Sequence, residues 1–369
     1  MERRAFLKSS ALGAAALAAA APAAPAIAQS RPDVKWRMAS SYPKNLDILY
    51  GGGEMIARRV AALTEGKFQI GTFAAGELMP AFQVLDAVQN GTIECGASPS
   101  FFYVGKDPTF AFDTALPFGL TTRQQTAWMY EGGGIDLMRT FYKSYNVIQF
   151  PAGNTGAQMG GWFRKEINSL EDLKGLKMRV SGLGGQVMAK LGAVPQSIAP
   201  SDLYAALERG AIDAGEWIGP YDDERIGFVK VAKYYYYPGW WDPCAQSNLF
   251  VNQQQWDALP KPYQAALEAA CAEAHNWIVA AYDARNPAAL RRLVAAGAQL
   301  RPFPQEMVRQ AEKVAFELYE EIAAKNEKFR AVYEPWKKFR EDILLWFSVA
   351  ELSLDSAIIT TDQARRRAR

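Results

Sequence analysis

Short apolar runs alternate with helically spaced apolar positions along the first two thirds of the chain. A first series predicts strand, helix, strand, helix and strand in turn, at 34–39, 48–63, 67–73, 81–90 and 93–99. Short strands separated by amphipathic helices are typical of an α/β fold with a mainly parallel sheet. The first series therefore predicts one α/β unit.

A second series of the same kind follows further along the chain. It predicts strands at 158–163, 177–180, 212–217 and 234–237, and helices at 185–191 and 200–210. Residues 169–172 (Ser-Leu-Glu-Asp) have the pattern of a capped helix start. Because no Pro- or Gly-rich linker separates the two series, we expect two lobes joined by several crossing segments, with a hinge and a cleft between them.

The last third of the chain is almost wholly helical in pattern. Long amphipathic stretches are predicted at 260–284, 305–325 and 335–365. Such helices can wrap back across both α/β units, and long terminal helices can also pair two copies of a chain. The sequence leaves a homodimer through the C-terminal helices open.

The N-terminus has the pattern of an export signal over 1–28. Arg3 and Arg4 precede Phe6-Leu7-Lys8, an Ala-rich run and an Ala-Ile-Ala cleavage pattern at 26–28. The paired arginines indicate twin-arginine export of a folded protein, which places the mature chain in the periplasm. Pro22 and Pro25 interrupt the run, which argues against a membrane anchor.

Charge and rare residues exclude several classes of function. The whole chain carries a formal charge of +2, which the signal alone accounts for, so the mature chain is close to neutral. A neutral surface argues against nucleic acid or an anionic membrane as the partner. The single histidine, His275, disfavours most hydrolases and metalloenzymes and is expected to be a packed or surface residue.

The three cysteines carry no recognisable chemistry. Cys95, Cys244 and Cys271 are odd in number and far apart, so they form neither a zinc motif nor a disulfide framework. One pair would bridge only if the fold brought it together.

Arg179 is the first candidate for binding a ligand. It alternates with Met178 and Val180 on a short predicted strand, so its side chain should face the other way, towards a surface or a cleft. A guanidinium group matches a carboxylate bidentately and stays charged at any physiological pH. An ordinary surface ion pair is the alternative for this residue alone.

The segments around Arg179 resemble the solute-binding subunits of TRAP transporters. The resemblance rests on 173–180 (Leu-Lys-Gly-Leu-Lys-Met-Arg-Val) and 200–213 (Pro-Ser-Asp-Leu-Tyr-Ala-Ala-Leu-Glu-Arg-Gly-Ala-Ile-Asp). Gly-Thr-Ile-Glu at 91–94 and Leu-Pro-Phe at 116–118 fit the same family. The resemblance implies a binding protein and not an enzyme, in which Arg179 binds the substrate carboxylate and a membrane permease receives the ligand.

The fold implied by this resemblance is an α/β, two-lobed periplasmic-binding-protein clamp, type II-like, with an interdomain cleft, hinge strands and long C-terminal helices. We expect the first lobe to comprise 29–154 and about 244–285. The second lobe would comprise 155–243 and about 286–369 with the bracing helices. About 340 mature residues exceed the usual size of one domain, which agrees with this division.

A further set of residues resembles the branch of the family that binds 2-oxo acids beside a cation. It consists of Gln158, the pair Glu216-Trp217 and residues 240–243 (Trp-Trp-Asp-Pro). The resemblance implies that the Gln158 amide oxygen, the Glu216 and Asp242 carboxylates and the Trp217 backbone oxygen surround the ion. Oxygen ligands of this kind suit Na⁺ or Ca²⁺.

The candidate substrate contacts are Arg179, Tyr103, Gln158, Trp217 and Asp242, with the Tyr103 hydroxyl as a donor to the ligand carboxylate. The candidates for the cleft wall are aromatic, with core packing as the alternative: Phe101, Phe102, Tyr103, Trp217, Trp240 and Trp241. Two carboxylates and an anionic ligand total three negative charges, which Arg179 alone does not offset in a desolvated cleft. When the charge of Arg179 is counted as well, a sodium ion would leave one negative charge in the cleft and a calcium ion none.

The predicted ligand is a short 2-oxo monocarboxylate such as pyruvate. Lactate, a dicarboxylate or an aromatic carboxylate remain alternatives, because an arginine recognises carboxylates in general. An enzyme exported in the folded state is the alternative from another class. The sequence offers it no nucleophile-base pair, phosphate loop or cofactor motif.

Overall fold

The computed structural model describes residues 32–367. Contacts between residues divide the chain into Met1–Asp33 and Val34–Arg369, and the fold below is that of the second part. The predicted export signal, 1–28, lies outside the described residues.

Five strands form the first sheet, in the order β2-β1-β3-β10-β4. They are β1 (Val34–Ser40), β2 (Phe68–Phe73), β3 (Cys95–Ser98), β4 (Val147–Asn154) and β10 (Gln246–Asn252). β1 runs parallel to β2 and β3, whereas β10 is antiparallel to β3 and β4. Buried Trp36 and Met38 alternate with exposed Lys35 and Arg37 along β1, which is the period-two pattern that predicted this strand.

Six strands form the second sheet, in the order β11-β9-β5-β8-β6-β7. They are β5 (Trp162–Phe163), β6 (Lys177–Arg179), β7 (Val194–Gln196), β8 (Ala214–Gly215), β9 (Tyr234–Tyr237) and β11 (Gln299–Pro302). β5 is antiparallel to β8 and β9, and the other neighbours are parallel. Both sheets are therefore mixed, which corrects the prediction of a mainly parallel sheet.

Strand β10 was not predicted, because polar residues interrupt its apolar pattern. All seven of its residues are buried. The amide nitrogens of Gln246 and Asn248 each donate to the backbone carbonyl of Asp113 at 3.0 Å, so these donors are paired inside the fold. Neither an apolar run nor an alternation marks such a strand in the sequence.

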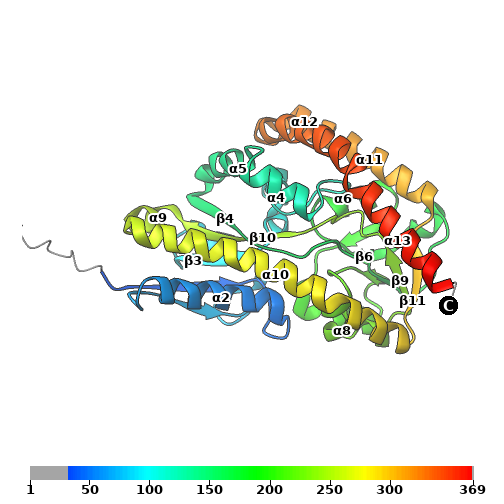
Figure 1. Cartoon of the computed structure of the whole chain (residues 1–369), viewed down its shortest axis with the longest axis horizontal. Coiled ribbons are helices and arrows are strands. Elements are labelled where there is room, and N and C mark those ends of the chain that lie inside the picture. Colours follow the sequence, from blue (N-terminus) through cyan, green and yellow to red (C-terminus); the bar gives the residue numbers. More distant parts are fainter. Residues whose placement is uncertain (1–31, 368–369) are drawn as a thin grey trace, which may run out of the picture. The chain divides into compact units, whose positions relative to one another are not determined.

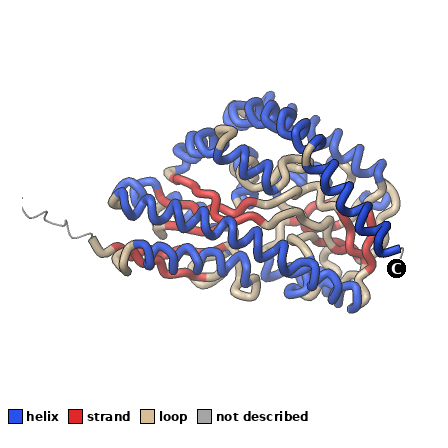
Figure 2. Tube along the Cα trace, viewed as in Figure 1, coloured by secondary structure: helices blue, strands red, loops and turns tan. Residues whose placement is uncertain are grey.

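Helices cover the strands from both sides (Figure 2). The shorter ones are α2 (Asp47–Leu63), α3 (Val84–Gln89), α4 (Thr122–Tyr130), α5 (Gly134–Tyr142), α6 (Gly182–Lys190), α7 (Leu203–Glu208), α8 (Pro220–Ile226) and α9 (Gln253–Ala258). Short 3₁₀ helices occur at Ala81–Gln83, Ser100–Tyr103, Pro108–Ala111, Lys143–Tyr145, Leu170–Leu173, Pro200–Asp202 and Phe228–Lys230. The predicted cap at Ser169 is present as a capping box with Asp172, although it opens a 3₁₀ turn.

Helix α10 (Lys261–Ala295) packs beside both sheets. It packs on α2 and β4 of the first sheet and on α8 beside the second sheet (Figure 1). The sequence predicted its end near residue 284, but it continues through Pro287. Its buried His275 is a packed residue whose pKa is lowered to about 4 by burial.

Three further helices end the chain: α11 (Gln305–Lys325), α12 (Glu327–Val349) and α13 (Glu351–Arg367). The first half of α12 buries Phe329, Val332 and Trp336 against α4, α5 and α11. The prediction of bracing helices holds for this half. No residue of α13 is buried.

Asp113 is a buried carboxyl group in the first lobe. It accepts hydrogen bonds from the Tyr142 hydroxyl at 3.0 and 3.3 Å and has no cation beside it among the described residues. Burial raises the pKa of Asp113 to about 7. The buried cysteines Cys95, Cys244 and Cys271 form no bridge.

We predict that Asp113 makes the fold less stable as the pH rises. Its folded pKa of about 7 lies above the ordinary aspartate value, so between about pH 4 and pH 7 the folded state binds more protons than the unfolded state. In the parent protein this difference lowers the free energy of unfolding by at most about 4 kcal/mol across that range, and Asp113→Asn should abolish this pH-dependent decrease. Urea unfolding at pH 5 and pH 8 measures this difference, and an equal pH dependence in both proteins would contradict it.

Candidate functional site

A small cavity of about 20 Å³ contains Arg179 in its lining. The first sheet and its loops contribute Tyr42, Leu49, Pro99, Phe101 and Phe102, and the second contributes Arg179, Trp217 and Ile218. Thr155, Gln158 and Ala245 come from the two segments that link the sheets. We call this space, defined by these eleven residues, the inner cavity.

Arg179 is the last residue of β6 and is only 1% exposed. Its Nη1 donates to the Glu216 carboxylate at 2.5 Å and to the Glu216 carbonyl at 2.7 Å, and its Nε lies 3.3 Å from the Ile198 carbonyl. Its guanidinium carbon lies 5.1 Å from the ring centre of Trp217. Within the described residues Nη2 has no hydrogen-bond acceptor, so this nitrogen remains for a ligand.

Two buried oxygen atoms in the same region also lack partners. Gln158 donates through Nε2 to Thr155 Oγ1 at 3.1 Å, which leaves its Oε1 without a donor among the described residues. Glu216 Oε1 accepts from Arg179 and from the Ser181 backbone amide, but Glu216 Oε2 accepts from none of the described residues. Unpaired buried acceptors are costly, and a cation or a ligand donor would satisfy them.

Asp242 completes a negatively charged region. It is 4% exposed and its carboxylate has no hydrogen bond within the described part of the chain. Burial, and then the charge of Glu216, raise the pKa of Asp242 well above its ordinary value. Burial likewise raises the pKa of Glu216, although Arg179 opposes this effect. The described residues contain no group of three or more His, Cys, Asp or Glu, so any cation here needs amide and backbone oxygens as well.

Glycines explain why the Gln158, Glu216 and Asp242 segments approach so closely. Gly161 has a φ of 83°, and a Cβ there would lie 2.7 Å from the Gly215 carbonyl. A Cβ on Gly239 would lie 2.7 Å from the Gln158 carbonyl. The predicted strand over 158–163 shrinks to Trp162–Phe163 because this glycine-containing segment leaves the sheet to line the cavity.

Trp217 is held in place by Asp222, which the sequence analysis did not single out. The indole Nε1 donates to Asp222 Oδ2 at 3.1 Å, and the same oxygen accepts from the Tyr282 hydroxyl at 2.8 Å. Tyr282 belongs to α10, so Asp222 links the cavity wall to the helix that packs on both sheets. Tyr42 and Thr155 were also missed, because a lone hydroxyl in a loop carries no sequence signal.

The remaining predicted residues lie elsewhere. Tyr103 is absent from the inner-cavity lining, and its hydroxyl bonds to Ser98 Oγ at 3.1 Å and to the Leu85 amide at 3.2 Å. Trp240 stacks on Phe118, and Trp241 packs on Phe303. Of the aromatic residues predicted to wall the cleft, Phe101, Phe102 and Trp217 line the cavity.

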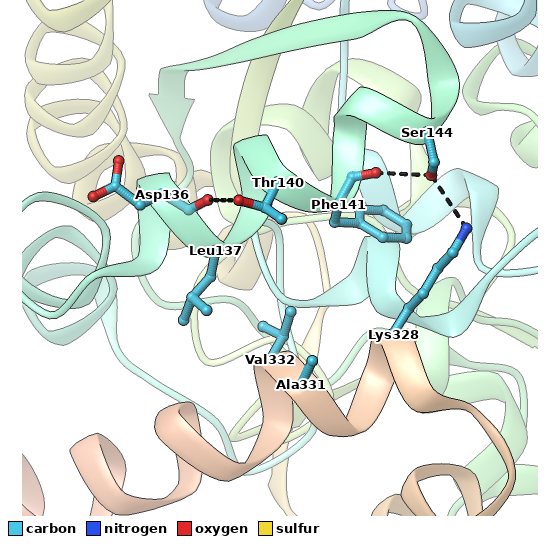
Figure 3. A pocket seen from close by; sticks show the side chains of 8 residues that line it. All are labelled: Asp136, Leu137, Thr140, Phe141, Ser144, Lys328, Ala331 and Val332. Carbon is cyan, nitrogen blue, oxygen red and sulfur yellow. Dashed lines mark hydrogen bonds between the residues drawn. The ribbon is translucent and has the colours of Figure 1, made fainter.

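A larger groove of about 330 Å³ lies between α5 and α12 (Figure 3). Its lining is mostly apolar, and its one cation, Lys328, bonds to Ser144 Oγ at 3.1 Å and faces the rings of Phe141 and Tyr145. The lining of this groove includes none of Arg179, Gln158, Glu216, Trp217 and Asp242. The inner cavity is the candidate site.

Comparison with known proteins agrees with this site. The family model described as bacterial extracellular solute-binding protein, family 7, matches residues 39–326. The chain belongs to this family. Family 7 members are TRAP solute-binding proteins, which confirms the predictions of a two-lobed periplasmic binding protein and of a function that is not enzymatic.

Three relatives of this family 7 protein are similar over nearly their whole length. A Nostoc protein named monocarboxylate 2-oxoacid-binding periplasmic protein is 50% identical, over 96% of this chain and 98% of its own. A Bordetella bronchiseptica TRAP protein with calcium and picolinate is 52% identical, with a TM-score of 0.89 over 92% and 100% of the two chains. A Pseudoalteromonas atlantica protein with sodium and pyruvate is 38% identical, with a TM-score of 0.85 over 88% and 99%.

We predict that Arg179→Ala destabilises the family 7 protein as well as removing its carboxylate binding. The substitution leaves Glu216 as an unpaired buried charge, which costs roughly 3–5 kcal/mol. The double variant Arg179→Ala with Glu216→Gln should recover part of this loss. Urea unfolding measures both effects, and a single variant as stable as the parent would show that the ion pair has no such role.

Proposed function

We propose that this chain binds a short 2-oxo monocarboxylate, such as pyruvate, together with one cation in the inner cavity, and delivers it to a TRAP membrane permease. The observation that carries the proposal is the group of unpaired buried atoms, Gln158 Oε1 and Glu216 Oε2, beside the free Nη2 of Arg179. Relatives support it: the Nostoc protein is named for 2-oxo acids, and the Pseudoalteromonas protein holds sodium and pyruvate.

Each residue has one role in this proposal. Arg179 Nη2 binds the ligand carboxylate, while its Nη1 keeps Glu216 in position. The cation is held by Gln158 Oε1, Glu216 Oε2, the Asp242 carboxylate and the Trp217 backbone oxygen, and it supplies positive charge and coordination sites for the carboxylate and 2-oxo oxygens. Trp217 and Phe101 exclude water from the ligand. The position of Tyr103 outside the lining argues for a supporting role in the core.

The charges favour a cation in this site. Arg179 and Glu216 neutralise each other, so the ligand and Asp242, once a cation has displaced its proton, together contribute two negative charges. Calcium would cancel both, and sodium would leave one for hydrogen bonds to absorb. The Bordetella relative contains calcium and the Pseudoalteromonas relative contains sodium, so both ions are candidates.

The inner cavity is small in this arrangement of the two sheets. At about 20 Å³ it has room for about one water molecule, so even a small ligand requires its walls to move apart, and a large one requires a larger movement. Lactate is the alternative that retains a second oxygen able to share the cation. An aromatic carboxylate is the other, because picolinate occupies the Bordetella relative.

We also propose that the two sheets are the centres of the two lobes, with the boundaries predicted from the sequence: 29–154 with about 244–285, and 155–243 with about 286–369. The β10 strand, which returns to the first sheet, and the end of α10 near the second sheet support this division. A ligand that contacts both lobes would stabilise their closed arrangement.

We predict that pyruvate raises the melting temperature only when Na⁺ or Ca²⁺ is present. Ligand that binds the folded state alone stabilises it in proportion to the logarithm of its concentration. Chelator in a sodium-free choline buffer should abolish the shift, and adding back either ion should restore it. Propanoate, which has the same length without the 2-oxo oxygen, is the matched control.

Two outcomes of that thermal-shift experiment would change the proposal. Failure of every 2-oxo and 2-hydroxy acid to stabilise the protein would overturn it. A clear preference for succinate over pyruvate would instead make a dicarboxylate the ligand. Asp242→Asn, which keeps the shape and removes a charge, should weaken the dependence on calcium.

The exposed apolar residues of α12 and α13 support a second copy of this chain as a further partner. Leu345, Val349, Leu352 and Ile359 are 55–72% exposed, and their spacings of four, three and seven residues place them on one face, as in a helix-pairing seam. A window of 18 residues in Glu327–Arg367 has a mean hydropathy of 1.6, and none of it is buried. The Bordetella relative is described as a dimer. We propose that two copies pair through this seam.

We predict a dimer in light-scattering or sedimentation measurements, and a monomer for the double variant Leu352→Lys with Ile359→Lys. Two added charges at the seam are not buried without a large desolvation penalty. Thr361→Lys is the matched control and should remain dimeric, because Thr361 lies two and a half helical turns from Leu352 and therefore on the opposite face. A parent protein that is monomeric, or that binds vesicles of phosphatidylglycerol instead, would contradict this pairing.

A further inference from the structure

A second, larger cavity of about 400 Å³ adjoins the candidate site. We call it the outer cavity. Its lining includes Val104 from the first lobe and Val180, Ala189 and Pro195 from the second. Phe101 and Phe102 line both cavities, so these two side chains form the wall between them.

The two rings of this wall are supported from both lobes. Their centres lie 5.2 Å apart at 48°, and Phe102 makes an edge contact with Phe82 at 4.9 Å. Phe101 packs on Gly182, at the first turn of α6. There a Cβ would lie 2.7 Å from Phe101 Cδ2, and the φ of 61° also favours glycine. The absence of a side chain at Gly182 therefore lets Phe101 reach the second lobe.

The outer cavity has the chemistry of a site for a ligand side chain. Its walls are largely apolar, with Val104, Val180 and Pro195 among them, and Gln186 and Gln196 add amide groups. It has no charged residue in its lining, so it offers no second grip for a carboxylate. An apolar tail of several carbons suits it, whereas a dicarboxylate does not.

We propose that the Phe101–Phe102 wall determines the chain length of the ligand, by closing the carboxylate and cation site off from the outer cavity. This inference rests on the proposed function. With both rings in place, the inner cavity leaves no room for a chain longer than that of pyruvate, so a longer tail meets the wall. Removing one ring joins the two cavities, and the outer cavity then accepts the tail.

Phe102 is the ring on which the test is best made. Phe101 is almost fully buried and contacts Gly182 across the lobes, so its loss also weakens closure for every ligand. Phe102 is only partly buried, and its ring contacts the rings of Phe82 and Phe101, both from the first lobe. Truncation of Phe102 therefore changes the wall with little effect on contacts across the lobes.

The experiment compares the affinities of pyruvate and 2-oxohexanoate by calorimetry in buffer with calcium and sodium. The parent protein should prefer pyruvate at least tenfold, and Phe102→Ala should reduce or reverse that ratio by at least tenfold. Val104→Ala is the matched control, because Val104 lines the outer cavity alone, and it should keep the parent ratio. Phe102→Leu should give an intermediate ratio, and it replaces Phe102→Ala in the test if that variant does not fold.

The outcomes separate this inference from the proposed function. A parent protein that binds no 2-oxo acid refutes the proposed function. If the parent protein binds pyruvate and the Phe102 variant that folds keeps the parent ratio of affinities for the two acids, only the proposed role of the wall is contradicted. Equal affinity of the parent protein for both acids, or an equal shift in Val104→Ala, overturns it as well.

Discussion

The ion pair between Arg179 and Glu216 is buried almost completely, and the rest of the site follows from that fact. Removing two charges from water costs several kcal/mol for each ion, which their attraction repays only when the remaining hydrogen-bonding atoms are also satisfied. Arg179 meets this condition only at Nε and Nη1, whereas its Nη2 and Glu216 Oε2 have no partner among the described residues. A site that buries one carboxylate oxygen beside a second acid, Asp242, is therefore incomplete without a positive partner.

The fold around this pair brings backbone segments that are distant in the sequence into contact. Gly161 and Gly239 lack the side chains that would hold the Gln158 segment away from Glu216 and from the Asp242 loop. Asp222 then ties the Trp217 indole to Tyr282 on α10. Since α10 packs on both sheets, the position of the cavity wall depends on the same helix that supports both lobes.

The sequence could predict those parts of the fold whose physical signal is local. The alternation along β1, the long amphipathic helices and the cap at Ser169 are signals of this kind. β10 was not predictable, because its polar side chains are paired with a carbonyl more than a hundred residues away. Likewise, the sequence offered Arg179 and Glu216 as separate ligand contacts, and only the fold shows that one residue holds the other. The sequence also offered the Tyr103 hydroxyl as a ligand donor, but in the fold this hydroxyl is hydrogen-bonded to Ser98 and Leu85.

In such a site, a bound cation and a bound anion each raise the affinity for the other through electrostatic attraction alone. An anion without a cation would add negative charge beside Glu216 and Asp242, two groups whose pKa values burial already raises. A cation without an anion would leave coordination positions to water, in a cavity with room for little of it. Because such coupling is reciprocal, each ion raises the affinity for the other by the same factor. A 2-oxo acid gains from this coupling through two oxygens, whereas a simple carboxylate can offer the cation only its carboxylate group. In the proposed function, selectivity for the 2-oxo oxygen of the ligand thus follows from the burial of the Arg179–Glu216 pair.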